Sequence, residues 1–129
     1  MTEVPITVLM PAYNAAQYIA EAIQSVLEQT FTNFELLIVN DGSTDHTSNV
    51  LASFTDPRIR VINQVNGGVS VALNAGLREA RGTYIARFDA DDVCYPYRLE
   101  QQYLFVLLGS SLVLLCLKQG GHLLPSLYL

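Results

Sequence analysis

The sequence predicts an α/β protein built on a Rossmann-like, mostly parallel sheet with helices on both faces. Two observations lead to this fold class. Apolar strand-like runs alternate four times with helix-like segments through short connections, a pattern typical of parallel sheets covered by helices. A polar segment also follows each of the four apolar runs. With 129 residues, the chain is long enough to bury a core of this kind.

The first half of the chain supplies two strands and one helix. Residues 6–10 form a β-rich apolar run that ends at Pro11, which suits a buried strand. The next apolar residues recur at the i, i+3, i+4, i+7, i+8 spacing of a helix with one buried face: Ile19, Ala22, Ile23, Val26 and Leu27. Residues 34–40 are predicted to be the second buried strand.

A turn and a second helix follow. The sequence "DGSTD" turns the chain, and Ser43 or Thr44 can cap a helix that continues to about Phe54. Residues 58–63 are predicted to be the third strand.

The last repeat of the pattern begins after the Gly67-Gly68 turn. Apolar residues from Leu73 to Ala80 mark a third helix, which is expected to stop near Gly82. Residues 83–89 are predicted to be the fourth strand.

Composition excludes several classes of function. Half of the residues are hydrophobic and 15% are charged, which argues against a disordered chain. The net charge of −5 argues against a nucleic-acid partner, since sequence-independent binding needs a basic face.

The N-terminus lacks the pattern of a signal peptide, and Cys94 and Cys116 fit small buried hydrophobes in a reducing compartment. We therefore expect a cytoplasmic location, with a peripheral position at the membrane as a second option.

Residues 103–129 differ from the rest of the chain. They contain no Asp or Glu, and Lys118 is their one Lys or Arg residue. The apolar run at 104–117 has 14 residues and a Gly-Ser-Ser interruption, so it is short for a membrane span of about 20 residues. This run has two interpretations: it could form a buried strand or helix, or it could be a poorly folded, aggregation-prone end. We expect self-association through this apolar tail.

The polar segments after the predicted strands are expected to meet at one rim of the sheet. They read "PAYN", "NDGSTD", "QVNGG" and "DADD". In open α/β sheets, ligands bind beyond the carboxyl ends of the strands. The sequence therefore predicts a binding site at this rim.

The last of these segments holds three carboxylates: Asp89, Asp91 and Asp92. They could form a solvated turn, cap a helix that starts in "DDVCYPYRLEQQ", or bind a hard cation such as Mg²⁺ or Mn²⁺. Their place on the rim favours the cation. Because Mg²⁺ is usually held by one or two carboxylates plus substrate phosphates, we expect a substrate with a phosphate or diphosphate.

Other side chains at the rim have two interpretations each. Asp41 could build its turn or accept hydrogen bonds from a nucleobase edge. Tyr13 could lie at the edge of the core or serve as an aromatic plate for a base. Arg87 is expected to pair with an acidic neighbour, and Gly76 could reflect ordinary helix packing.

Residues from about Ile6 to Gln102 resemble the family 2 glycosyltransferases of the GT-A fold. The resemblance is carried by "ITVLMPAYNAAQYIAEAIQSVLEQTFTNFELLIVNDGSTDHT", "NGGVSVALNAGLREARGTYIARFDADD" and "PYRLEQQ". It implies an inverting transfer of a sugar from a nucleotide-diphosphate sugar, commonly a UDP-sugar, to a saccharide or lipid-linked acceptor, with Mg²⁺ or Mn²⁺ as cofactor. Asn40 replaces the first Asp of the frequent "DDGS" form.

The resemblance also implies roles for individual residues. Pro11, Tyr13 and Asp41 would line the nucleoside pocket. Asp89 would lie near the ribose or the sugar, and Asp91 would hold the cation against the diphosphate. Asp92 is a supporting donor-binding candidate.

The acceptor half of such an enzyme is not recognisable in this sequence. In this family the catalytic base is an Asp far downstream, whereas no Asp or Glu follows Glu100 here. We therefore assign no catalytic residue. We assign residues 1–102 to nucleotide-sugar binding, and 103–129 to an atypical tail of a truncated or frame-shifted reading frame.

Three other functions are alternatives to this one. A sugar-phosphate nucleotidyltransferase should carry a Gly-rich, basic loop after its first strand, and "PAYNAAQ" has neither feature. A phosphatase with an Asp-x-Asp nucleophile normally places it after the first strand, not the fourth. A nucleotide-sugar-binding fragment or interaction module without turnover remains the alternative.

Overall fold

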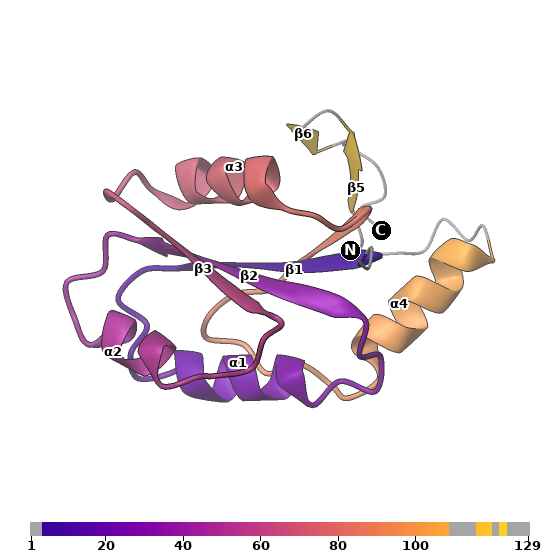
Figure 1. The fold of residues 1–129 in the computed structure, drawn as a ribbon, viewed down its shortest axis with the longest axis horizontal. Coiled ribbons are helices and arrows are strands. Elements are labelled where there is room, and N and C mark those ends of the chain that lie inside the picture. The colour runs from indigo at the N-terminus through magenta and orange to yellow at the C-terminus, as the bar shows by residue number, and fades with distance from the viewer. Residues whose placement is uncertain (1–3, 109–115, 120–121, 124–129) are drawn as a thin grey trace.

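A computed structural model describes residues 4–108, 116–119 and 122–123 of the chain. Its strands are β1 (Ile6–Ala12), β2 (Phe34–Asp41), β3 (Ile59–Gln64), β4 (Tyr84–Arg87), β5 (Cys116–Gln119) and β6 (His122–Leu123). Its helices are α1 (Ile19–Leu27), α2 (Thr47–Ala52), α3 (Val69–Glu79) and α4 (Arg98–Leu107) (Figure 1). Strands and helices alternate from β1 to α4, as the sequence predicts.

The strands form one sheet in the order β3-β2-β1-β4-β5-β6. The first four are parallel, with Ile6 of β1 in register with Phe34 of β2 and Tyr84 of β4. β5 and β6 add antiparallel pairs beyond β4. The chain winds outward from β1 to β3 and then returns to the other side of β1, so the winding reverses between β1 and β4. Such a reversal is where ligands bind in open α/β sheets.

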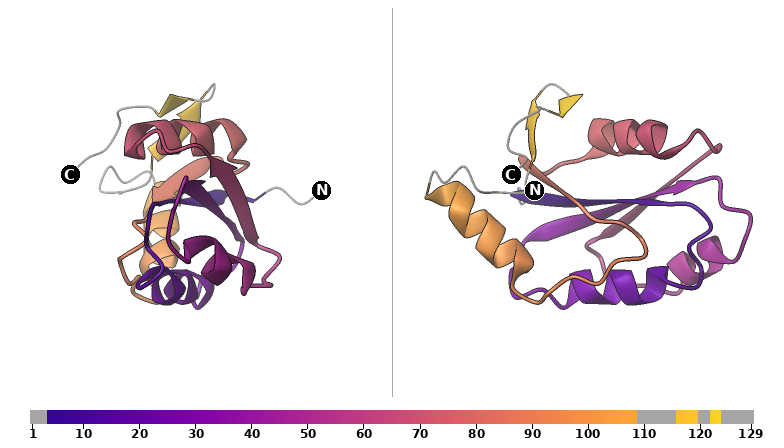
Figure 2. Two further views of the ribbon diagram at one scale, coloured as in Figure 1. Left: turned by 90° about the vertical axis from the view of Figure 1, so that its left-hand side faces the viewer. Right: turned by 180° about the vertical axis from the view of Figure 1, so that it is seen from behind.

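Helices cover both faces of the sheet, which confirms the predicted fold class. α3 lies over one face and α1 and α2 over the other (Figures 1 and 2). Alternate residues of one strand enter different cores, since successive side chains of a strand point to opposite faces. Val8 and Met10 of β1 pack in the core with α1, whereas Leu9 packs in the core with α3.

α3 approaches β1 closely because Gly76 has no side chain. A Cβ atom at this position would collide with the Leu9 side chain. Leu9 and Leu77 are each 1% exposed, so the space around this contact is filled. Gly76 therefore serves helix packing.

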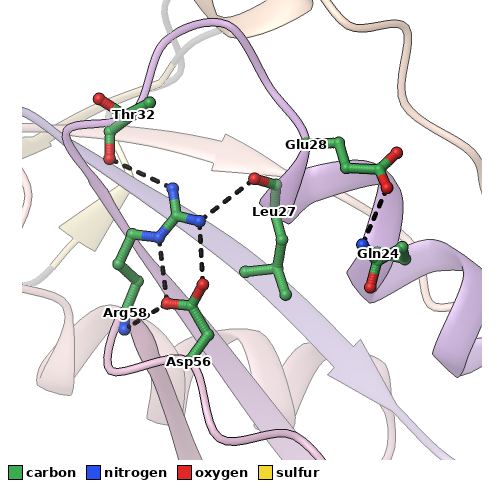
Figure 3. Close-up of polar contacts among 6 residues, drawn as sticks. All are labelled: Gln24, Leu27, Glu28, Thr32, Asp56 and Arg58. Atoms are coloured by element: carbon green, nitrogen blue, oxygen red, sulfur yellow. Dashed lines mark hydrogen bonds and ion pairs between the residues drawn. The ribbon is translucent and has the colours of Figure 1, made fainter.

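Arg58 ties the beginning of β3 to the end of α1 at the amino edge of the sheet. Its guanidinium donates to both carboxylate oxygens of Asp56, at 3.0–3.1 Å, and to the carbonyl oxygens of Leu27 and Thr32, at 3.2 and 3.4 Å (Figure 3). It also lies 4.6 Å from the centre of the Phe34 ring. These contacts satisfy a carbonyl that the end of α1 leaves without an intrahelical partner.

Glu35 forms a second, more buried cluster at the same edge. Its carboxylate accepts from the Thr7 hydroxyl at 2.7 Å, the Arg81 amide at 2.7 Å and the Arg60 guanidinium at 2.8 Å. Burial alone would raise the pKa of Glu35, but these three donors outweigh it and lower the pKa. The Glu35 carboxylate therefore joins β1, β2, β3 and the segment before β4.

One predicted helix start is wrong, and so is one of the three interpretations of Asp89, Asp91 and Asp92. α2 begins at Thr47, not after Ser43 or Thr44, and ends at Ala52, two residues before Phe54. α4 begins at Arg98, six residues after Asp92, so the Asp cluster does not cap it. The fourth strand also ends at Arg87, which leaves Asp89 in the loop.

The predicted tail is only partly described. Residues 103–107 belong to α4, whose range crosses the boundary predicted at residue 102, and β5 and β6 lie within the tail. Residues 109–115, 120–121 and 124–129 lie outside the described residues. Within the described part, we find no helix with the length and apolar character needed to cross a membrane.

Candidate functional site

A cleft of about 570 Å³ lies at the carboxyl edge of the parallel strands. The loops that leave β1, β2 and β3 gather at this edge, at the left of Figure 1. The residues that line the cleft are Pro11, Ala12, Tyr13, Asn14, Ala15, Tyr18, Asp41, Asn66, Gly68, Val69, Ala72, Asp89, Ala90 and Asp91. They lie at or after the carboxyl ends of all four parallel strands, so the rim predicted from the polar loops coincides with a cleft.

Five of the six predicted site residues line this cleft: Pro11, Tyr13, Asp41, Asp89 and Asp91. Asp92 does not, but it belongs to the adjacent acidic cluster. Tyr13 is 52% exposed and is therefore not a core residue. Its phenol ring is available as an apolar wall for a planar ligand.

Asp89, Asp91 and Asp92 form the acidic cluster. Each offers one carboxylate oxygen, and these oxygens lie within 4.8 Å of one another. The Asp92 amide donates to the Asp89 carbonyl at 3.1 Å, so a tight turn brings the three side chains together. Arg87 pairs with Asp89 at 3.5 Å, as predicted.

The acidic cluster fits a hard divalent cation. Mg²⁺ binds oxygen ligands at about 2.0–2.1 Å in an octahedron, so neighbouring ligand oxygens lie about 2.9 Å apart and opposite ones about 4.2 Å. All three side chains are exposed, so they are free to rotate toward one ion. Exposure also leaves room for ligands from a substrate or from water.

Asp41 is 3% exposed and organises the β3–α3 loop. Its Oδ1 accepts from the Gln64 side chain at 2.7 Å and the Gly67 amide at 2.9 Å. Its Oδ2 accepts from the Gly68 amide at 2.9 Å and the Asn66 side chain at 3.3 Å. Two donors on each oxygen use the usual capacity of a carboxylate.

The charge state of Asp41 follows from these contacts. Burial alone would raise the pKa of Asp41, but the hydrogen bonds from Gln64, Gly67 and Gly68 outweigh it and lower the pKa. Asp41 is therefore ionised at neutral pH. Its role toward a nucleobase stays a prediction, whereas its role in holding the loop is a feature of the structure.

Sequence reasoning missed several residues of the cleft, among them Asn14, Asn66 and Gly68. Asn14 adopts a positive φ of 48° and Gly68 one of 94°; Asn and Gly are the residues that tolerate this region best. The "YN" and "NGG" stretches carried this signal. It indicates tight turns, although not which ligand they face.

The chain is similar to known proteins over most of its length. The model of the family described as glycosyl transferase family 2 matches residues 7–117. An uncharacterized glycosyltransferase of Rickettsia prowazekii, RP339, is 41% identical over 97 residues, which cover 75% of this chain and 30% of the relative.

Two solved structures have a fold similar to that of this chain. Staphylococcus aureus TarS 1–349 in complex with UDP-GlcNAc has a TM-score of 0.76 at 29% identity, covering 80% of this chain and 31% of that one. The mannosyltransferase PcManGT of Pyrobaculum calidifontis, in complex with GDP-Man and Mn²⁺, has a TM-score of 0.72 at 27% identity, covering 80% and 32%. This chain thus spans about a third of the length of the chains in these two structures.

The family match covers far more than half of the chain, and the fold agrees with that of the solved glycosyltransferases. The sheet order and the cleft at its reversal point are consistent with this match. The chain therefore belongs to glycosyl transferase family 2.

Proposed function

We propose that this chain forms the donor-binding part of an inverting, metal-dependent glycosyltransferase that uses a nucleotide-diphosphate sugar, with a UDP-sugar as first candidate. One observation carries the proposal. A single cleft brings together the exposed ring of Tyr13, the buried carboxylate of Asp41 and the acidic residues Asp89 and Asp91. An aromatic wall and a cation-binding cluster at one cleft suit the base and the diphosphate of such a donor.

Each side chain has a proposed role. The ring of Tyr13 stacks on the base, and Pro11 completes the apolar wall beside it. Asp89 contacts the ribose or the sugar, while Asp91, supported by Asp92, holds Mg²⁺ or Mn²⁺. A divalent cation at this place supplies positive charge that stabilises the departing diphosphate.

Asp41 can meet the base edge only by exchanging a hydrogen bond. Its oxygens already accept from four donors, of which Gly67 and Gly68 use backbone amides. Gln64 and Asn66 donate from side chains, whose rotation leaves the backbone unchanged. We therefore expect a base N–H to replace one of these two donors on the Asp41 carboxylate.

The acceptor site and the catalytic base are not assigned to this chain. The proposed acceptor is a saccharide or a lipid-linked saccharide, reached from the cytoplasm or from the membrane surface. Binding of a nucleotide sugar without turnover is the alternative function. Release of UDP from UDP-sugars, with and without acceptors, separates the two.

Self-association is a further proposal. Four apolar residues of the α4 end are exposed: Leu104, Phe105, Leu107 and Leu108. Leu104, Leu107 and Leu108 recur at the i, i+3, i+4 spacing and so share one side of the helix, and an exposed apolar surface of this kind favours association. Light scattering across a concentration series tests it, and a constant monomer mass would contradict it.

Calorimetry with UDP tests the donor and metal assignments. We expect binding with Mn²⁺ or Mg²⁺ and much weaker binding with EDTA. Asp91→Asn should abolish most of the UDP affinity that depends on the metal. Glu28→Gln is the control: it removes one negative charge from an exposed residue at the end of α1 and should leave this affinity unchanged. Equal affinity with metal and with EDTA would contradict the assignment, and stronger binding of GDP would redirect it to another donor.

A further inference from the structure

The β1–α1 loop is fixed to the β2–α2 loop by side chains. Three consecutive backbone amides of the first loop, those of residues 14–16, donate to side chains of the second loop and of Thr47, the first residue of α2. Asn14 donates to the Ser43 hydroxyl at 3.1 Å, Ala15 to the Thr47 hydroxyl at 3.0 Å and Ala16 to the Asp45 carboxylate at 3.2 Å. We call these contacts the loop clasp.

Asn14 closes the clasp from the other side. Its Oδ1 accepts from the backbone amides of Thr44, at 2.8 Å, and Asp45, at 3.3 Å. Asn14 holds a positive φ of 48°, a conformation in which a short polar side chain can bond locally. The two loops thus exchange hydrogen bonds in both directions, between residues about 30 positions apart.

Asp45 is the centre of the clasp because it also orients Thr47. Its Oδ1 accepts from both the amide and the hydroxyl of Thr47. Because the Thr47 hydroxyl donates its hydrogen to Asp45, its oxygen is left to accept the hydrogen bond from the Ala15 amide. Thr47 is fully buried, so its hydroxyl is shielded from water, whereas Asp45 is exposed. The hydrogen bonds from Thr47, together with the backbone amides, also lower the pKa of Asp45, which keeps it charged at neutral pH.

The clasp lies behind the wall of the cleft. Tyr13, Asn14 and Ala15 line the cleft, whereas Asp45 and Thr47 do not. The Tyr13 ring is half exposed, so burial alone does not hold it, and its position follows from the backbone beside it. A wall held in place before binding lowers the ordering cost of binding.

We propose that Asp45, acting through Thr47 and the amides of Ala15 and Ala16, is a positioning residue that sets the Tyr13 wall of the nucleotide cleft. The proposal rests on the proposed donor-binding function. It names a carboxylate that touches no ligand yet controls affinity for the base and ribose end of the donor.

A tryptophan reporter makes the proposal measurable. The chain has no Trp, so Tyr13→Trp places a single fluorophore on the wall. We expect UDP with Mn²⁺ to quench it. Adding Asp45→Ala should weaken UDP affinity about tenfold, equivalent to about 1.4 kcal/mol, and reduce the maximal quench.

Paired variants separate positioning from general stability. Thr47→Val, which removes the hydroxyl, should reproduce the loss, and Thr47→Ser, which keeps it, should restore binding. Asn14→Gly keeps the positive φ but loses the side-chain bonds, so it should weaken binding as well. Asp56→Ala is the matched control, because it removes an ion pair at the opposite edge and should leave UDP affinity unchanged.

The outcomes are distinct. Wild-type affinity for UDP in both Asp45→Ala and Thr47→Val overturns the proposal. It is also overturned if these variants lose the amide-exchange protection of residues 14–16 but still bind UDP with wild-type affinity. An equal loss in Asp56→Ala also overturns it, because stability would then explain the effect. If the unmodified chain does not bind UDP with Mn²⁺, the proposed function fails and this inference fails with it.

Discussion

The two edges of the parallel sheet use their carboxylates in different ways. At the amino edge, Glu35 lies 2.8 Å from the Arg60 guanidinium, and Asp56 lies 3.0 Å from that of Arg58. At the carboxyl edge, Asp41 and Asp45 are held by neutral amides, carboxamides and hydroxyls. Neutral donors satisfy the oxygens without cancelling their charge. The amino edge is therefore neutralised, and the carboxyl edge stays negative.

The acidic cluster extends this difference. Asp89, Asp91 and Asp92 crowd three exposed carboxylates together, and in the described part of the chain Arg87 is the cation paired with them, at 3.5 Å. That pair is exposed on both sides and contributes little, about 0–1 kcal/mol. Carboxylates that hold the fold have partners within the chain, whereas those of the cluster suit a partner from outside. The predictions below test this difference.

The largest expected effect is at Glu35. Glu35→Ala leaves the Thr7 hydroxyl and the Arg81 amide without this acceptor, and it removes the buried partner of Arg60, which keeps its more exposed contacts with Glu79. Breaking a buried pair costs about 3–5 kcal/mol; because Arg60 is partly exposed, we expect a loss of about 2–4 kcal/mol in the free energy of unfolding, measured in urea. Glu79→Ala is the control. Its carboxylate approaches the same Arg60 at 3.8 Å but is exposed, so it should cost under about 1 kcal/mol, and equal losses would contradict the comparison.

A smaller effect is expected at Arg58. Arg58→Lys keeps the charge but replaces the planar fork that contacts Asp56, Leu27 and Thr32 together. An ammonium group cannot make these contacts at once, so the free energy of unfolding should fall by about 1–2 kcal/mol. Urea unfolding measures it. Unchanged stability would show that charge alone matters at this edge.

Low pH should destabilise the amino edge of the sheet, because the Glu35 carboxylate then becomes protonated. Its pKa in the folded chain is lowered from the ordinary value of 4.5. A lowered folded pKa means that its stabilisation is present above about pH 4.5 and is lost as the pH falls through the folded pKa. Glu35→Gln should therefore show a smaller loss of melting temperature than the wild type between pH 5 and pH 3. A steeper loss in the variant would reverse the sign and contradict the assignment.

The smallest effect, of opposite sign, is expected in the acidic cluster. Asp91→Asn removes one of three crowded charges and should leave the stability of the metal-free chain unchanged or raise it by up to about 0.5 kcal/mol. Melting in EDTA measures it, with Asp92→Asn as a parallel variant. A large loss of stability would show that Asp91 holds the fold, and the difference between the two edges would then disappear.

Much of the fold was predictable because it depends on local patterns. The apolar runs at 6–10 and 34–40 became β1 and β2, and the helical spacing around Ile23 became α1. Polar loops after parallel strands must meet at one edge, so the rim and most of its site residues followed from the element order. The family resemblance drew on the same stretches.

The sequence by itself thus determined the alternation of elements, the fold class and the place of the acidic cluster. Only the tertiary structure decided what the loop side chains do. Ser43, which was predicted as a helix cap, instead accepts a hydrogen bond from the Asn14 amide, 29 residues away. Asp41 holds Gly67 and Gly68, 26 and 27 residues away. Such contacts depend on strand order and on the register of β1, β2 and β3, and local propensity carries no information about either, since it describes each residue against its neighbours in the chain.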